Sequence, residues 1–287
     1  MLLQRVITAV VLLAVLLAAL LSPGPLPLTL LLTLTAACAL WEWLRLTWRD
    51  PPAQAPIVTA VIAAVALGAL ALQWIRPSPA VWATNLHGLI HFWLMPVVVL
   101  LWIVAVLPMV IRGQTSGRTG GLPLSLFGVV AIIAVWAALL EMFLIRGAWF
   151  LVSLLALVWF ADIGAYFTGR ALGKHKLAPN VSPGKTWEGA AGGILAAVVW
   201  VLATSYVENS FGAALGERWP LWGVALITVL LTALSIVGDL FESLLKRRAG
   251  VKDSSGLLPG HGGVYDRIDA LLPVAPMALL LTGVWFQ

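Results

Sequence analysis

Charged residues gather in one short stretch of this sequence, GDLFESLLKRRAGVKDSSGLLPGHGGVYDRID at residues 238–269. The stretch holds ten charged residues in 32 positions, while its flanks, residues 219–237 and 270–286, are almost wholly apolar. Apolar flanks of this length predict helices that cross a membrane, so the charges lie where such helices meet water. Carboxylates are costly to keep at such a place, which indicates that these have a chemical role.

Three polar side chains of this stretch share one face if the preceding helix continues to its polar end. Asp239, Ser243 and Lys246 stand at i, i+4 and i+7, with Glu242 beside them. A carboxylate takes a metal ion, while a hydroxyl and an ammonium group take phosphate oxygens. The row therefore predicts a site for a metal-bound phosphate.

A glycine-rich loop follows this helix and leads to a second group of acids. Its glycines, Gly262 and Gly263 among them, let backbone N–H groups approach an anion closely. Asp266 and Asp269 then head the last apolar segment, with Arg267 between them. Complementing a helix dipole explains Asp269 but explains two acids around an arginine less well. Carboxylates on two helices, separated by a glycine loop and flanked by basic side chains, suit a magnesium-dependent reaction on a polyphosphate.

A second polar block, ADIGAYFTGRALGKHKLAPNVSPGKTWEG at residues 161–189, joins two apolar segments. Asp162 lies inside the first segment, so we expect its carboxylate to face protein or a water-filled cavity. Lys185 stands just before the next helix, where free backbone N–H groups and a lysine make a natural phosphate site. The block is no P-loop, because Pro179 stands where that motif needs glycine and no strand is expected before it. A basic cytoplasmic loop followed by a capped helix is the alternative explanation.

Composition sets the fold class. With 61% hydrophobic residues, 10% charged residues and a mean hydropathy of +1.01, the chain has too little polar surface to cover a soluble globule. We therefore expect an all-α, polytopic integral membrane protein. The single cysteine, Cys38, lies in an apolar run, which excludes a disulfide framework and a thiolate metal site. The net charge of +5 resides in loops between apolar runs, so no nucleic-acid partner is expected.

Windows of about twenty apolar residues predict nine membrane helices. They lie near residues 6–21, 26–46, 57–75, 91–111, 127–143, 148–167, 189–206, 219–245 and 270–286. The first resembles a signal peptide but is followed by no small-x-small cleavage site, so we expect it to stay as a helix. With the N-terminus in the cytoplasm, all of the 17 Lys and Arg residues except Arg76, Arg146 and Arg218 fall inside. This bias predicts a bacterial-type inner-membrane protein whose polar blocks face the cytoplasm.

The two parts of this single membrane domain differ in how many polar motifs they contain. Residues 1–160 supply N-terminal helices, and residues 161–287 are expected to carry the cytoplasmic-facing active site. In the first part, Glu42 is expected to contact a neighbouring helix or lipid headgroups. His87 and His91, four residues apart, have a spacing that can hold a metal ion, but interfacial histidines at a helix entrance are the favoured interpretation.

These motifs resemble the signature of the phosphatidate cytidylyltransferases, the CDP-diacylglycerol synthases. The resemblance rests on SLLKR at residues 243–247, KD at 252–253 and HGGVYDRID at 261–269. The block from Asp162 to Gly189 also resembles the family, which more often has a basic residue where Gly184 stands. Elsewhere the N-terminal half shares only its hydrophobic character and a faint Glu42-Trp43 match.

The resemblance implies that CTP and phosphatidate react to give CDP-diacylglycerol and pyrophosphate. It makes Mg²⁺ the cofactor and Asp239 and Asp266 its ligands, with a second cation left open. The implied catalytic residues are these two with Ser243, Lys246, Arg247 and Lys185. The implied substrate-binding residues are Lys185, Thr186, Ser182, Asp162, Lys252, Asp253, His261, Gly262, Gly263, Arg267 and Asp269.

Other interpretations remain beside this one. Another CTP-dependent membrane transferase, such as a CDP-archaeol synthase or a polyprenol kinase, would need similar groups. A secondary transporter also buries carboxylates in helices, but it should show paired halves with interrupted helices, and the sequence has none that we detect. The lipid bilayer is an expected partner, and a homodimer is left open.

Overall fold

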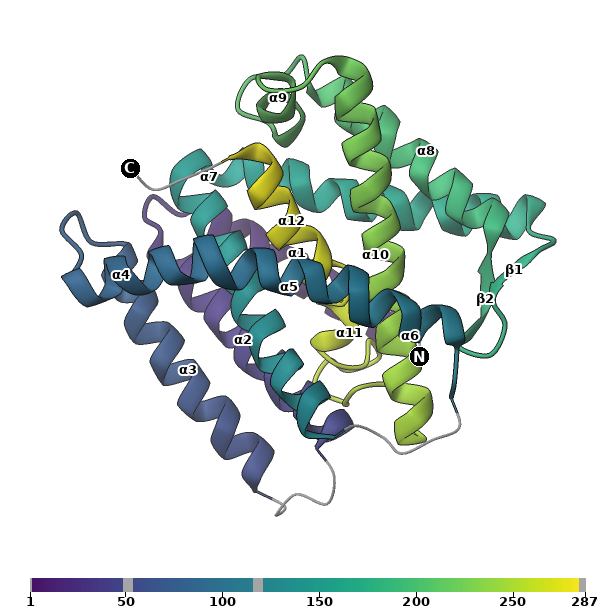
Figure 1. Ribbon diagram of the computed structural model, residues 1–287, viewed down its shortest axis with the longest axis horizontal. Helices are drawn as coiled ribbons and strands as arrows, with labels where there is room; N and C mark the ends of the chain where they lie inside the picture. Colours follow the sequence, from purple (N-terminus) through teal and green to yellow (C-terminus); the bar gives the residue numbers. More distant parts are fainter. Residues whose placement is uncertain (1, 49–53, 116–120, 284–287) are drawn as a thin grey trace. The chain divides into compact units, whose positions relative to one another are not determined.

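The structure is a computed structural model that describes residues 2–48, 54–115 and 121–283 (Figure 1). Helices make up nearly all of it, as the sequence predicted, and one two-stranded hairpin interrupts them. The helices are α1 (Leu2–Leu20), α2 (Leu26–Thr47), α3 (Ala55–Trp74), α4 (Val81–Leu89), α5 (Met95–Leu101), α6 (Leu107–Arg112), α7 (Leu122–Leu172), α8 (Trp187–Thr204), α9 (Phe211–Gly216), α10 (Leu221–Ala249), α11 (Tyr265–Ile268) and α12 (Leu271–Thr282). Two π-helical turns, η1 (Ile90–Leu94) and η2 (Trp102–Val106), and the strands β1 (Lys176–Ala178) and β2 (Ser182–Thr186) complete the order.

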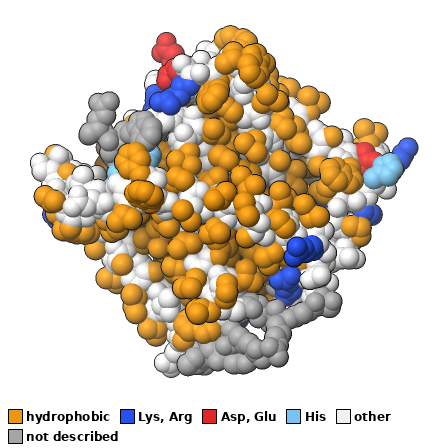
Figure 2. Space-filling view, viewed as in Figure 1, with side chains coloured by type: hydrophobic (Ala, Val, Ile, Leu, Met, Phe, Trp, Pro, Cys, Tyr) orange, Lys and Arg blue, Asp and Glu red, His pale blue; other side chains and the backbone are white. Residues whose placement is uncertain are grey.

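Six helical runs among the described residues are long and apolar enough to cross a membrane. They are α2, α3, the run Val81–Arg112, α7, α8 and α10. The predicted count of nine is therefore not confirmed. Val6–Leu20 within α1 is also apolar but is not among these six runs. The helix α12 has only 12 residues, and the end of the span predicted there lies outside the described residues. Hydrophobic side chains dominate the face seen in Figure 2, and charged ones form a few small groups, as in a membrane protein.

The helix α7 accounts for another difference in the count, because it joins two of the predicted spans. Its 51 residues would measure about 76 Å at 1.5 Å per residue, far more than a hydrocarbon core of about 30 Å. The helix breaks at Gly147, whose φ of 83° and ψ of −176° are not helical. A residue without a Cβ adopts such angles readily. The break lies between the predicted spans 127–143 and 148–167, so each arm of α7 has the length of one crossing.

The chain forms two compact units, each assembled from segments far apart in the sequence. The first unit comprises Met1–Val98, Gly117–Leu140 and Leu245–Ile268. The second comprises Val99–Ser116, Glu141–Leu244 and Asp269–Gln287. The predicted division at residue 160 concerned the location of the active site and stays a prediction. The first unit joins N-terminal helices to the glycine-rich loop before α11.

In the first unit, α2 packs against α3 and α11 (Figure 1). Trp43 of α2 is fully buried, and its indole Nε1 donates a hydrogen bond of 2.9 Å to the carbonyl of Leu124. Its ring lies 5.1 Å from that of Tyr265, measured between centroids. A side chain at Gly128 would collide with the indole. These contacts fix α2 beside the start of α11.

In the second unit, the arm of α7 after Gly147 packs closely on α8 through small residues. A Cβ atom at Gly164 would collide with the carbonyl of Gly192, and one at Gly193 with the carbonyl of Ala161. The antiparallel hairpin of β1 and β2 precedes α8, with Ala178 opposite Ser182. The expectation that no strand comes before Pro179 is therefore wrong, because β1 ends at Ala178. The hairpin escaped prediction because its strands are short and polar.

Candidate active site

Asp239 and Lys185 form an ion pair in the second unit. Asp239 lies on α10, which continues to Ala249, so the condition for Asp239, Ser243 and Lys246 to share one helical face is met. The Lys185 Nζ atom, at the end of β2, lies 2.6 Å from Asp239 Oδ2. The side chain of Lys185 is 26% exposed and that of Asp239 is 36% exposed, so water or a ligand can reach both. The hairpin thus presents a cation to a carboxylate of the neighbouring helix.

Two further carboxylates converge on Asp239. One carboxylate oxygen of Asp239, one of Glu242 and one of Asp269 all lie within 4.8 Å of one another. Burial, and next the charge of Asp239, raise the pKa of Asp269 well above its ordinary value. Crowded carboxylate oxygens repel one another, and a bound cation relieves that repulsion. Because Mg²⁺ prefers hard oxygen ligands, this donor set fits it.

A cavity of about 480 Å³ adjoins the ion pair and lies wholly within the second unit. Asp239, Lys185 and Asp162 lie on its wall, as does Arg170. Asp162 thus faces a cavity, as the sequence predicted. Much of the remaining wall is apolar, Ile236 included. The cavity combines a charged side with an apolar side, which suits a ligand with a phosphate group and a lipid portion.

The start of α8 holds the hairpin in place. Thr186 caps the helix, because its Oγ1 accepts a hydrogen bond of 3.1 Å from the N–H of Gly189. Glu188 accepts bonds from the N–H groups of Lys174 and His175, and a 2.6 Å contact joins its Oε1 to His175 Nδ1. Since Gly189 already donates to Thr186, the phosphate site predicted here depends more on Lys185 than on backbone N–H groups.

Asp266 organises a separate polar group in the first unit. It accepts hydrogen bonds from Lys246 Nζ at 2.9 Å, from the N–H of Ser254 at 3.1 Å and from the N–H of Gly263 at 2.7 Å. The side chains of Asp266 and Lys246 are only 5% and 16% exposed. Gly262 has a φ of 82°, and a Cβ there would also collide with Asp266. A glycine is thus required at position 262 by the packing around Asp266.

The remaining predicted site residues differ in how exposed their side chains are. Arg267 is exposed, and its Nη2 donates a hydrogen bond of 2.8 Å to the carbonyl of His261, so it supports the loop. Ser182 and Ser243 are half-buried. Exposed side chains that remain candidates for contacts to substrate are Arg247, Lys252 and Asp253.

The predicted residues therefore fall into two groups. The structure brings Asp239, Asp269 and Lys185 together in the second unit, and Lys246 and Asp266 together in the first. Asp239 and Asp266 belong to different units, so their meeting at one magnesium ion stays a prediction.

Sequence reasoning did not rank three acids that the structure makes prominent. They are Glu42, Glu188 and Glu242. Glu242 stands one helical turn after Asp239, and that spacing was a signal available in the sequence. Glu188 stands two residues after the helix cap, where an acid often serves the N-terminus of a helix. For Glu42 the sequence offered only the faint Glu42-Trp43 match to the family.

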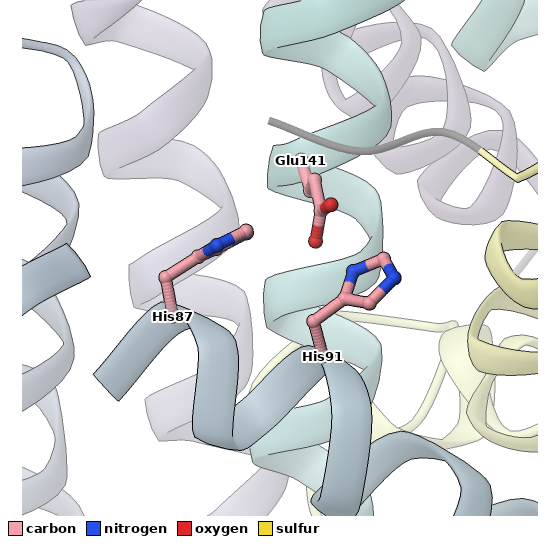
Figure 3. Close-up of side chains that lie close together, drawn as sticks. All are labelled: His87, His91 and Glu141. Atoms are coloured by element: carbon pink, nitrogen blue, oxygen red, sulfur yellow. The ribbon is translucent and has the colours of Figure 1, made fainter. Parts of the chain in front are cut away.

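His87 and His91 lie outside both groups. Their ring centroids are 5.9 Å apart, and both side chains project from the same side of the run formed by α4 and η1 (Figure 3). His91 is buried, at 2% exposed, and the interpretation of the two histidines as interfacial stays a prediction. Figure 3 also labels Glu141, a fully buried acid of α7 in the second unit.

Known proteins resemble this chain along nearly its whole length. A family model described as the cytidylyltransferase family matches residues 3–285. A phosphatidate cytidylyltransferase of Haemophilus influenzae is 37% identical over an alignment of 286 positions that covers 96% of each chain. One of Pseudomonas aeruginosa is 38% identical over an alignment of 290 positions that covers 99% of each chain. One of Brucella suis is 49% identical over 137 positions, which cover 48% of each chain. The family resemblance in the sequence is thus confirmed, and the chain belongs to the cytidylyltransferase family.

Proposed function

We propose that this protein is a phosphatidate cytidylyltransferase, which converts CTP and phosphatidate into CDP-diacylglycerol and pyrophosphate. The observation that carries the proposal is the similarity to proteins of that name over 96% or more of the chain. The site is compatible with it, because carboxylates and a lysine lie beside a cavity that has charged and apolar walls. A lipid substrate needs such a cavity at membrane level, and a nucleotide needs cationic side chains.

The reaction needs an in-line displacement at phosphorus. A phosphate oxygen of phosphatidate attacks the α-phosphorus of CTP, and pyrophosphate leaves with the electrons of the broken P–O bond. The nucleophile is already an anion, so no residue has to act as a general base, and no covalent intermediate with the protein is needed. Mg²⁺, when bound, neutralises charge on the triphosphate and helps to orient it.

The chain's own residues have positioning and electrostatic roles in this scheme. Lys185 and Lys246 supply positive charge to phosphate oxygens, each from a place beside a carboxylate. Asp239 is the principal metal ligand, with Asp266 from the sequence pattern and with Asp269 and Glu242 from the geometry. The apolar wall of the cavity receives the lipid portion near its phosphate.

The charge distribution supports a place in the bacterial inner membrane with the N-terminus and the polar groups on the cytoplasmic side. The nine predicted crossings would put the C-terminus outside. A reporter fused after Gln287 that is active in the cytoplasm would contradict this topology.

An assay of purified protein tests the function itself. CTP labelled at the α-phosphate should transfer its label to phosphatidate and release pyrophosphate, and CTP labelled at the γ-phosphate should leave the lipid unlabelled. A polyprenol kinase would transfer the γ label to dolichol instead. Preference for an archaeal ether-lipid phosphate over phosphatidate would identify a CDP-archaeol synthase, and either result would overturn the proposal.

We expect Lys185→Ala to raise the KM for CTP about tenfold or more, or to lower kcat to that extent. A hydrogen bond to a charged group contributes about 1.5 to 3 kcal/mol of stabilising free energy. The variant also removes the Lys185 ammonium group that pairs with Asp239. Steady-state kinetics at varied CTP concentration measures the effect. Lys176→Ala, an exposed lysine of the same hairpin, is the control and should keep normal kinetics. Normal kinetics in a stable Lys185→Ala protein would leave Lys185 as a topology-setting charge only.

A further inference from the structure

Glu42 of α2 is fully buried, and both of its carboxylate oxygens bind residues more than two hundred positions later in the chain. Its Oε1 accepts hydrogen bonds from Ser255 Oγ at 2.5 Å and from the N–H of Val264 at 3.0 Å. Its Oε2 accepts hydrogen bonds from Ser254 Oγ at 3.0 Å and from the N–H of Tyr265 at 2.6 Å. Of the two expected contacts, the one with a neighbouring helix is present, because Tyr265 is the first residue of α11. The other three donors lie in the loop before that helix.

Three of these donors lie in one segment, which we call the glycine loop and define as residues 250–264, and the fourth, Tyr265, follows it directly. Ser254 and Ser255 lie in its first half, while Val264 ends it. Glu42 therefore ties both halves of the loop to α2. Space for its carboxylate exists because residue 263 is glycine, since a Cβ atom there would collide with both Glu42 oxygens.

Asp266 holds the same loop from its other side. Its carboxylate accepts from the N–H groups of Ser254 and Gly263, and it pairs with Lys246. Ser254 consequently gives its hydroxyl to Glu42 and its N–H to Asp266. The position of Asp266 and Lys246 thus depends on a loop whose shape Glu42 fixes.

Burial of the Glu42 carboxylate costs free energy, and this cost indicates that the carboxylate has a specific role. A carboxylate buried at the end of a membrane-spanning helix is expensive unless several donors compensate for its lost hydration. A hydroxyl or an apolar residue would hold α2 in place at less cost, whereas only a carboxylate offers two oxygens to four converging donors. Neighbouring Trp43 supports the geometry, because its ring packs against Tyr265.

We propose that Glu42 is a positioning residue for the transfer reaction, which sets the glycine loop so that Asp266 and Lys246 can act on the metal-bound triphosphate. The inference rests on the proposed function. Glu42 belongs to the N-terminal half, which the signature motifs do not reach, so the reaction would depend on a residue far from them in the sequence.

The test compares wild type with Glu42→Gln, which keeps the shape of the side chain. An amide replaces one acceptor oxygen by an NH₂ group, and a serine hydroxyl can turn to accept from it but a backbone N–H group cannot. Hydrogen exchange of the purified protein without Mg²⁺ or CTP should speed up at least tenfold in peptides that cover residues 254–265. In the assay with phosphatidate, the Mg²⁺ concentration for half-maximal rate and the KM for CTP should both rise at least fivefold.

Thr47→Val is the matched control. Thr47 is a buried polar residue of the same helix, and its hydroxyl bonds to the carbonyl of Trp43 and to Ser125. Its loss should weaken the packing of α2 without changing the KM, the magnesium dependence or exchange in the glycine loop. Should Glu42→Gln fail to fold, Ser255→Ala is the second variant. It removes the hydrogen bond that the half-buried Ser255 donates to Glu42, and it should also speed up hydrogen exchange in the glycine loop.

Each result decides a separate point. Unchanged exchange in the glycine loop, or a lower rate with an unchanged KM and magnesium dependence, would overturn the role of Glu42. A wild-type protein that transfers nothing from CTP to phosphatidate would overturn the proposed function, and the exchange experiment would still decide whether Glu42 holds the loop.

Discussion

Asp239→Asn should lower kcat/KM for CTP by about a thousandfold while the protein stays folded. Loss of a single group that stabilises transition-state charge typically costs a factor of about a hundred to a thousand, and a metal ligand supports binding as well. Asp239 forms an ion pair with Lys185, and its carboxylate also lies close to those of Glu242 and Asp269. Asparagine keeps its size but removes the charge on which both depend. Steady-state kinetics measures the effect. Size-exclusion chromatography of the detergent-solubilised protein checks that the variant is folded.

Glu217→Gln is the matched control for this variant. Glu217 is also an acid of the second unit with a basic partner, since its Oε2 lies 3.4 Å from Arg146 Nη2. Its ion pair lies outside the acidic group, so activity should change little. An Asp239→Asn protein with more than a tenth of wild-type activity would show that Asp239 is no essential ligand.

Asp269→Asn distinguishes two ways of holding the cation. The family resemblance implied a substrate-binding role for Asp269 and made only Asp239 and Asp266 metal ligands, whereas the geometry puts the Asp269 carboxylate beside that of Asp239. A loss as severe as that of Asp239→Asn would place the cation among the three acids of the second unit. A mild loss would favour the pair Asp239 and Asp266.

Local spacing predicted the parts of the site that lie on one element. The helix carrying Asp239 and Lys246 was predicted because helical periodicity is a property of neighbouring residues. Asp162 was expected to face protein or a water-filled cavity because a charge inside an apolar segment needs a polar environment. Both expectations agree with the structure, where α10 ends at Ala249 and Asp162 lies on a cavity wall.

Contacts between distant segments escaped the same reasoning. Glu42 and its partners are separated by more than two hundred residues, and no periodicity links them. The predicted number of membrane helices is not confirmed, and the differences include the last predicted span, where α12 has only 12 residues. The break at Gly147, by contrast, lies between two spans that hydropathy had already separated. Family resemblance identified the chemistry but did not reveal which acids lie near one another.

Asp266→Asn should lower kcat/KM for CTP by about a hundredfold or more and should loosen the glycine loop as well. Asp266 accepts from Lys246, Ser254 and Gly263, and it is 5% exposed, so these donors have little water to turn to. Asparagine replaces one acceptor oxygen by a donor and leaves the charge of Lys246 uncompensated. Kinetics and hydrogen exchange of peptides covering residues 254–265 measure the two effects on the same protein.

The two aspartate variants should therefore differ in a way that activity alone would hide. Asp239→Asn should leave exchange in the glycine loop unchanged, because its partners Lys185, Glu242 and Asp269 lie in the second unit. Asp266→Asn should change it, and should share this property with Glu42→Gln, because both acids bind Ser254. Normal exchange in Asp266→Asn would show that the loop does not depend on this carboxylate. A magnesium-bound structure with the Asp239 and Asp266 carboxylates more than about 8 Å apart would rule out one shared ion, since direct ligands lie at about 2.0 to 2.6 Å.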